Sequence, residues 1–333
     1  MEPENTVRLE HCALDVLPNL TALRAEGLSL EGNLFRFIQP HNLPTRLKFL
    51  SLTRNSLTSA NVFHQMVYPS LETLILDSNY IHGIYDLASS APNLKTLSLV
   101  VNSIHHIDTL TEFHQLENLY IAHNYIEVLD SIPRTLKKLN AACCKIRMIQ
   151  SRMPAGLEKI NLSTNSLKFA GLPFHWGSCL RELDLSFNKL QKFPRKLPDT
   201  LEVLYIQENL IIELPDTLPE SLRILIASDN KILTIPLYKR ARLELFVMTH
   251  NRLTDLTYGQ EIATVFIAEH NWNKPVHAIV VNRVIKLWRR YCLKLRLRSI
   301  VRTQRLRNSL LEVAMCPSRL GFFEPIPTGW RDS

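Results

Sequence analysis

The sequence predicts an α/β-type solenoid, in which short repeats stack and contribute their strands to one parallel sheet. A pattern of the form Leu-x-x-Leu-x-Leu-x-x-Asn-x-Leu recurs every 20 to 24 residues through most of the 333-residue chain. The apolar fraction of 46% is sufficient for a continuous core along such a stack. Gly is rare, with 9 residues, whereas 18 Pro residues supply most of the breaks between repeats.

Ten regular copies carry the pattern, one of them with Leu47, Leu50, Leu52 and Leu57 at its Leu positions. The Asn position recurs at Asn55, Asn79, Asn102, Asn124, Cys144, Asn165, Asn188, Asn209, Asn230 and Asn251. On these residues the chain resembles the leucine-rich-repeat family over residues 7–272. The resemblance implies a right-handed superhelix whose parallel sheet is concave.

Each position of the repeat has a physical role. Alternate residues of a short strand point to one face, so Leu50 and Leu52 are expected in the core. The Asn follows the strand, where its amide can satisfy backbone groups of its own turn and of the neighbouring coil. The nine Asn residues are therefore predicted to form a structural ladder, with Cys144 as a small substitute.

Weaker copies flank the ten regular ones and are expected to cap the stack. We place Leu28 in the Asn position of the second copy and His270 in that of the last, which gives about 13 coils. Pro-marked segments such as Phe193-Pro194 and Leu214-Pro215 predict extended or 3-10 connectors on the convex side. The domain prediction is a solenoid over residues 1–273, a basic helical region and C-terminal cap over 274–314, and an extended arm over 315–333.

The outward strand positions predict a partner-binding patch on the concave face. These positions are polar in the middle of the chain, as at Lys138 and Lys159, and turn apolar in the last four coils. The predicted patch residues are Val203, Tyr205, Ile224, Ile226, Leu245, Val247, Phe266 and Tyr120. Contiguous apolar area on a solvated face usually marks a contact. The alternatives are coverage by the chain's own tail and a simple preference of strands for branched residues.

Charge is concentrated in the C-terminal segment. The chain has a formal net charge of +8, yet residues 274–333 hold 13 Lys and Arg against 3 Asp and Glu. The rest of the chain is near neutral, with 26 basic and 28 acidic residues. The basic residues singled out are Arg283, Lys286, Arg289, Arg290, Lys294, Arg296, Arg298, Arg302, Arg305 and Arg307.

Apolar residues at helical spacing, among them Val284, Trp288 and Cys292, predict an amphipathic helix in this segment. Residues 284–294 resemble an IQ motif, although Ile285 stands where that motif has Gln and Arg290 where it has Gly. Three interpretations stay open: binding of a calmodulin-like protein, binding of nucleic acid or an anionic surface, and capping of the solenoid. With residues 314–319 (Ala-Met-Cys-Pro-Ser-Arg), the segment resembles leucine-rich-repeat proteins of giant DNA viruses, which implies a virion component or a host-directed, effector-like protein.

No enzyme, metal or cofactor motif appears in the sequence. It contains no Gly-rich phosphate loop, HExxH, GxSxG or kinase signature, and the six Cys show no CxxC pair. The absence of clustered Cys at the repeat ends favours a reducing, intracellular location, and neither a secretory signal nor a membrane span is recognised. We therefore expect a non-catalytic protein-binding scaffold without a cofactor, with its partner and oligomeric state undetermined.

Overall fold

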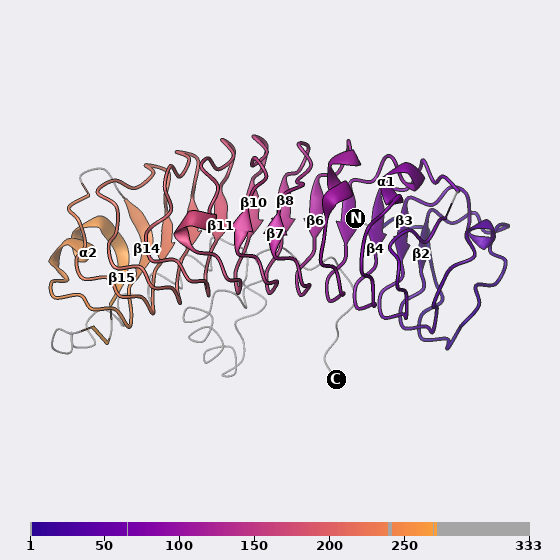
Figure 1. Ribbon diagram of the computed structural model, residues 1–333, viewed down its shortest axis with the longest axis horizontal. Coiled ribbons are helices and arrows are strands. Elements are labelled where there is room, and N and C mark those ends of the chain that lie inside the picture. Colours follow the sequence, from indigo (N-terminus) through magenta and orange to yellow (C-terminus); the bar gives the residue numbers. More distant parts are fainter. Residues whose placement is uncertain (1, 65, 239–241, 269, 272–333) are drawn as a thin grey trace. The chain divides into compact units, whose positions relative to one another are not determined.

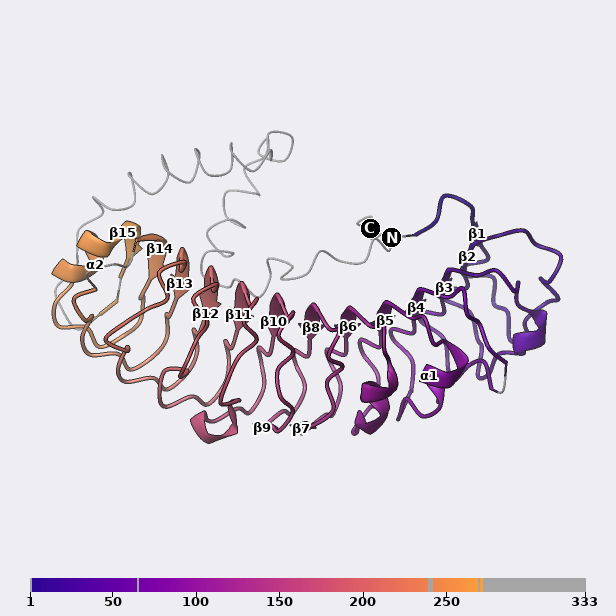
Figure 2. The ribbon, with the colours of Figure 1, turned by 90° about the horizontal axis from the view of Figure 1, so that it is seen from above.

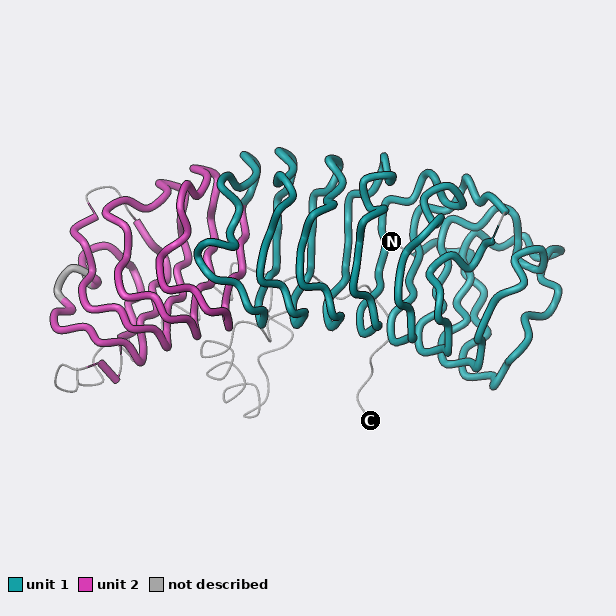
Figure 3. Tube along the Cα trace, in the orientation of Figure 1, with its two compact units in different colours: residues 1–180, 326–333 teal, residues 181–325 magenta. Residues whose placement is uncertain are grey.

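The computed structural model describes residues 2–64, 66–238, 242–268 and 270–271. The chain divides into two compact units, of which unit 1 contains residues 1–180 and unit 2 begins at Arg181 (Figure 3). Each unit is a stack of coils, and every coil has one short strand followed by a turn and a connector (Figure 1). In both units the strands line one side of the coils and the connectors line the other (Figure 2).

Unit 1 has a sheet of eight parallel strands in its described part, and sequential coils pair with each other. Phe49 lies opposite Thr73, which in turn lies opposite Thr96. The strands are β1 (Thr6–Arg8), β2 (Gly27–Ser29), β3 (Phe49–Ser51), β4 (Thr73–Ile75), β5 (Thr96–Ser98), β6 (Asn118–Tyr120), β8 (Lys138–Asn140) and β10 (Lys159–Asn161).

Unit 2 continues the same design with five parallel strands in the part that the structure describes. They are β11 (Glu182–Asp184), β12 (Val203–Tyr205), β13 (Ile224–Ile226), β14 (Leu243–Val247) and β15 (Ala263–Ile267). The register is again one residue to one, since Leu183, Leu204 and Leu225 lie opposite one another. The parallel-sheet solenoid predicted from the repeat is therefore confirmed.

The leucine positions form the core. Leu50 and Leu52 are 0% exposed, and Leu57, at the end of the pattern, is 1% exposed. A single coil has only one layer of apolar side chains and cannot bury them alone. Stacking places each layer between two others, which removes the apolar area from water.

The Asn side chains bridge neighbouring coils. Nδ2 of Asn79 donates to the carbonyl of Leu52 in the preceding coil and to that of Leu76 in its own coil, both at 3.0 Å. Its Oδ1 accepts the backbone N–H of Leu57 at 3.0 Å. The residue before it, Ser78, has a φ of 54°, which turns the chain off the strand. Equivalent bonds recur at Asn55, Asn102, Asn124, Asn165, Asn209, Asn230 and Asn251.

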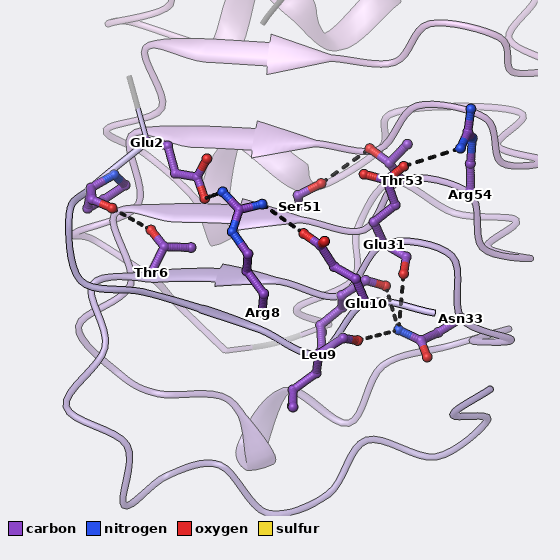
Figure 4. Close-up of polar contacts among 12 residues, drawn as sticks. Glu2, Thr6, Arg8, Leu9, Glu10, Glu31, Asn33, Ser51, Thr53 and Arg54 are labelled. Atoms are coloured by element: carbon purple, nitrogen blue, oxygen red, sulfur yellow. Dashed lines mark hydrogen bonds and ion pairs between the residues drawn. The ribbon is translucent and has the colours of Figure 1, made fainter. Parts of the chain in front are cut away.

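Two predicted ladder positions at the ends were wrong. Asn33, not Leu28, bridges the first coils. Its Nδ2 donates to the carbonyl of Leu9 at 2.7 Å (Figure 4). It also donates to the carbonyl of Leu30 at 2.9 Å. Leu28 lies in the core and is 0% exposed. In the last coil Asn271, not His270, donates to the carbonyls of Met248 and Ala268, both at 3.0 Å.

The connectors are mostly extended, as predicted, with short helical turns in some coils. Unit 1 has the 3-10 turns η1 (Pro40–Asn42), η2 (Asp108–Glu112) and η3 (Phe169–Gly171), and one α-helical turn, α1 (Leu87–Ser90). A small parallel pair, β7 (Val128–Leu129) and β9 (Met148–Ile149), joins two of its connectors. Unit 2 has α2 (Thr257–Ile262) immediately before β15.

Within the described ranges no helix has the length and apolarity that a membrane span requires. The predicted regions 274–314 and 315–333 lie outside the described residues.

Candidate functional site

The predicted patch residues of unit 2 form two rows on the side of its sheet that faces away from the leucine core. Val203, Ile224 and Leu245 lie opposite one another in register, and all three are half-buried. Tyr205, Ile226 and Val247 form the second row, in which Ile226 is 4% and Val247 is 2% exposed. We call these six residues the apolar patch. They come from three consecutive strands, so the repeat itself brings together side chains about 20 residues apart in sequence.

Phe266 does not belong to the patch, contrary to the prediction. It pairs with Phe246, which pairs with Leu225 of the core, and the two rings lie 5.4 Å apart. Phe266 is therefore a core residue, at 6% exposure. Val265 and Ile267, opposite Leu245 and Val247, occupy the outward positions and extend both apolar rows by one coil.

Tyr120 is also not brought together with the patch. It is a half-buried residue of β6 in unit 1, where it lies opposite Ser98 and Asn140. These two neighbours are polar, and Oδ1 of Asn140 accepts a hydrogen bond from the backbone N–H of Ala142 at 3.2 Å. The structure therefore gives Tyr120 a different environment from that of Tyr205.

Unit 2 begins with a buried carboxyl group on the same face. Asp184 of β11 is 1% exposed and lies opposite Tyr205. Its Oδ1 accepts hydrogen bonds from the backbone N–H of Ser186 at 2.9 Å and from the Ser186 hydroxyl at 2.6 Å. Burial raises the pKa of Asp184 to about 6, although the two hydrogen bonds act in the opposite direction.

Gln207 is a residue that the sequence analysis missed. It follows β12 beside Tyr205, is 1% exposed, and has no hydrogen-bond partner for either Nε2 or Oε1. At the same position the next two coils have Ser228 and Thr249, whose hydroxyl groups are hydrogen-bonded to each other at 2.9 Å. The sequence signal was available, because Gln207 is the one amide at a position that Ser or Thr fills in the other three coils from Ser186 to Thr249.

A row of titratable side chains borders the patch. The residue directly before the ladder Asn has a φ between 52° and 57° in four successive coils of unit 2. These residues are Glu208, Asp229, His250 and His270. Nδ1 of His250 lies 3.5 Å from Oδ1 of Asp229, and the rings of His250 and His270 stack at 4.7 Å. Burial raises the pKa of Asp229, whereas nearby His250 lowers it, and burial together with the charge of Asp229 raises the pKa of Glu208.

Candidate metal ligands do not converge in the described part of the chain. No group of three or more His, Cys, Asp or Glu side chains there has the arrangement that would hold an ion. The basic residues predicted as a second site, Arg283 to Arg307, lie outside the described residues.

Comparison with known proteins gives matches to repeat proteins throughout. Residues 69–126 match the model of the family described as leucine rich repeat. The chain is 32% identical over 183 residues to podocan-like protein 1 of Mus musculus, covering 52% of this chain and 29% of that protein. It is 34% identical over 142 residues to fibromodulin of Gallus gallus, covering 42% of this chain and 32% of that protein. The chain thus spans about a third of the length of these relatives.

Solved structures show the same fold. The leucine-rich repeat domain of APL1B superposes with a TM-score of 0.66 at 21% identity, covering 80% of this chain and 82% of that one. A chain of an octameric complex of Latrophilin 3, Unc5D and FLRT2 superposes with a TM-score of 0.65 at 20% identity, covering 81% and 91%. Together with the ladder and the parallel sheets, these similarities show that the chain has the leucine-rich-repeat fold.

Proposed function

We propose that the chain is a non-catalytic scaffold that binds another protein through the apolar patch of unit 2. The observation that carries this proposal is the register of its two rows, since three consecutive strands align Val203 with Ile224 and Leu245, and Tyr205 with Ile226 and Val247. The leucine-rich repeats of FLRT2 form part of an octameric complex with Latrophilin 3 and Unc5D, which is in keeping with a protein-binding role for this fold.

Strand propensity alone does not account for these rows. Strands β8, β10 and β11 have the same conformation and place Lys138, Lys159 and Glu182 at the position of Val203. The fold therefore accepts charged residues there, and the apolar residues of unit 2 need another reason. Completing the burial of a half-buried Val, Ile or Leu side chain contributes about 1 kcal/mol, so three such residues can support a specific contact.

Gln207 supplies the polar part of the proposed contact. A buried amide without partners costs about 1–3 kcal/mol, a cost that the fold retains in the unbound protein. Both amide atoms are closed to solvent in the free chain, so a partner's main chain would reach Oε1 and Nε2 only if the surrounding side chains shift on binding. Binding with such a shift would remove a penalty of the free state as well as burying apolar area.

Two paired sets of variants test the proposal. In the full chain, Ile224→Ser with Leu245→Ser should abolish capture of a binding partner, whereas Thr96→Ser with Asn118→Ser, at the same repeat positions of unit 1, should not. The four residues are half-buried, so each set should fold, which circular dichroism checks. Retention of the partner by a folded Ile224→Ser, Leu245→Ser variant contradicts the proposal.

Coverage of the patch by the chain's own C-terminal segment is the competing interpretation. On that interpretation the Ile224→Ser, Leu245→Ser variant should lose thermal stability in the isolated protein, and no partner should be lost. Truncation after residue 273 should then expose the patch and lower solubility. The two interpretations therefore differ in whether the isolated chain or its complex is affected.

A second proposed function is a salt-sensitive tether to nucleic acid, an anionic surface or a calmodulin-like protein. The observation that favours it is the segregation of 13 basic and 3 acidic residues into 274–333. Charge reversal at Arg289 and Arg290 should weaken such binding, and more so at low salt. The roles as a virion component or a host-directed protein stay predictions. The similarities to known proteins do not support the predicted intracellular location.

A further inference from the structure

Two neighbouring coils of unit 1 place an imidazole and a thiol side by side. His123 and Cys143 each lie directly before the ladder residue of their coil, with φ values of 56° and 52°. The N–H of His123 donates to the carbonyl of Ala142 at 2.9 Å, and the N–H of Cys143 donates to the carbonyl of Ser163 at 2.9 Å. The parallel register of β6 and β8 therefore fixes the two side chains next to each other on the edge of the sheet.

The two side chains interact, and a third coil adds a hydroxyl group. A hydrogen bond with His123 holds the pKa of the Cys143 thiol below its usual value, burial opposes this shift, and a hydrogen bond with Thr164 supports it. The same contact raises the pKa of His123. Both shifts act in the direction of a thiolate beside an imidazolium.

Solvent reaches this pair. Cys143 is half-buried, and both His123 and Thr164 are exposed. The adjacent Cys144 differs in every respect: it is 9% exposed, its thiol donates to the carbonyl of Ile121 at 3.3 Å, and burial raises its pKa to about 11. Only one of two consecutive cysteines is thus presented for reaction.

We propose that Cys143 is a modification site for hydroperoxides, with His123 as the group that accepts and returns the proton. His123 takes the thiol proton, and the thiolate attacks the terminal oxygen of the hydroperoxide. A sulfur–oxygen bond forms as the oxygen–oxygen bond breaks, and the departing alkoxide takes the proton from His123. The sulfur is oxidised by two electrons to a sulfenic acid, and the hydroperoxide is reduced to an alcohol, or to water when hydrogen peroxide reacts.

The sulfenic acid should persist until an external thiol reduces it. Cys144 cannot resolve it as a disulfide without leaving its ladder position, where it holds the turn to the preceding coil. The proposed modification concerns the edge of unit 1 and is independent of binding at the apolar patch. Its failure would leave the proposed function unaffected.

The experiment compares the cysteines within one intact chain. The full-length protein is treated with iodoacetamide, or with hydrogen peroxide followed by dimedone, and each cysteine is followed by fragment-ion mass spectrometry. Cys12 and Cys179 are exposed thiols and serve as internal references. We expect Cys143 to be alkylated at least about threefold faster than either reference at pH 7, and to give the main dimedone adduct.

Variants separate the role of the imidazole from a general effect on folding. His123→Gln keeps a polar side chain without a base and should lower the Cys143 rate to that of Cys12 and Cys179. His250→Gln removes an imidazole from the same repeat position in unit 2 and should leave the Cys143 rate unchanged. The proposal is overturned if Cys143 reacts no faster than the references, if His123→Gln leaves its rate unchanged, or if peroxide yields no dimedone adduct at Cys143.

Discussion

Replacing Cys144 with Asn should stabilise the protein, because Cys144 is a weak substitute in the ladder. The thiol has one proton, which it directs to the carbonyls of Ile121 at 3.3 Å and Ala142 at 3.6 Å. In the preceding coil Asn124 donates to the carbonyls of Leu99 and Ile121, both at 2.9 Å, and accepts the N–H of Ile104 at 2.9 Å. An Asn at position 144 would occupy the same environment.

The gain follows from counting bonds. The amide would replace a weak sulfur donor by two N–H donors, and a weak sulfur acceptor by an oxygen for the backbone N–H of Ile126. Each buried neutral hydrogen bond contributes about 1 kcal/mol net, and ordering the larger side chain costs part of the gain. We expect Cys144→Asn to raise the free energy of unfolding by about 1–2 kcal/mol.

Urea unfolding followed by circular dichroism measures the change, and hydrogen exchange locates it. The amide of Ile126 should exchange more slowly in Cys144→Asn than in the natural chain. Cys144→Ser is the matched control, since its short hydroxyl cannot span the two coils, and it should be less stable than the natural chain. A Cys144→Asn variant that is no more stable than the natural chain would contradict the proposed role of the ladder amides.

Three further substitutions have expected outcomes. Asn79→Ala leaves the buried N–H of Leu57 without a partner and removes one of the two amide donors from each of the carbonyls of Leu52 and Leu76, so it should lower the free energy of unfolding by about 3 kcal/mol, measured in urea. Gln207→Met removes a buried, unpaired amide, so it should raise the midpoint of unfolding of the free protein while weakening capture of the partner; a lower midpoint would contradict the unpaired state. Because burial raises the pKa of Asp184 to about 6, its contribution to stability is fully present below the unfolded pKa and is lost as pH rises through 6. Asp184→Asn should therefore add about 2 kcal/mol at pH 7.5 and little at pH 4, and equal effects at both pH values would refute the assignment.

The regular coils could be predicted from the sequence because every position in them has one physical role. The ladder residue must be a small side chain with a donor and an acceptor, and Asn79 shows why, since it uses both. Each strand must place alternate residues in the core, so the outward positions of Val203 and Tyr205 follow from their place one residue before and after the core residue Leu204. Both conclusions need only the repeat, which is local information.

The last coil could not be placed by the same reasoning, because the core residue of its strand is Phe266 and not leucine. In the last coil Phe266 fills the place of Leu225, and Ala268 precedes Asn271 as Met248 precedes Asn251. The apolar residues on either side, Val265 and Ile267, fit the leucine spacing one residue out of phase. A slip of one residue exchanges the two faces of a strand, and this slip moves Phe266 from the core to the patch in the sequence-based prediction.

The polar features of the site also depended on neighbours that sequence alone does not reveal. Gln207 is unusual only because no side chain of an adjacent coil satisfies it, whereas Ser228 and Thr249 satisfy each other. His123 and Cys143 are 20 residues apart and become partners through the register of two strands. Such pairs can be found by aligning the coils position by position and reading across them.

Site-specific photo-crosslinking determines whether the apolar patch of unit 2 contacts a protein partner. A benzoylphenylalanine is placed at position 245 of the apolar patch, or at position 159 in the same row of unit 1, in the otherwise natural full-length chain. We expect position 245 to form a cross-link to a discrete protein partner, position 159 to form none, and Ile224→Ser to remove the cross-link. Equal cross-linking from both positions, or cross-links from position 245 only to residues 274–333 of the same chain, would contradict it.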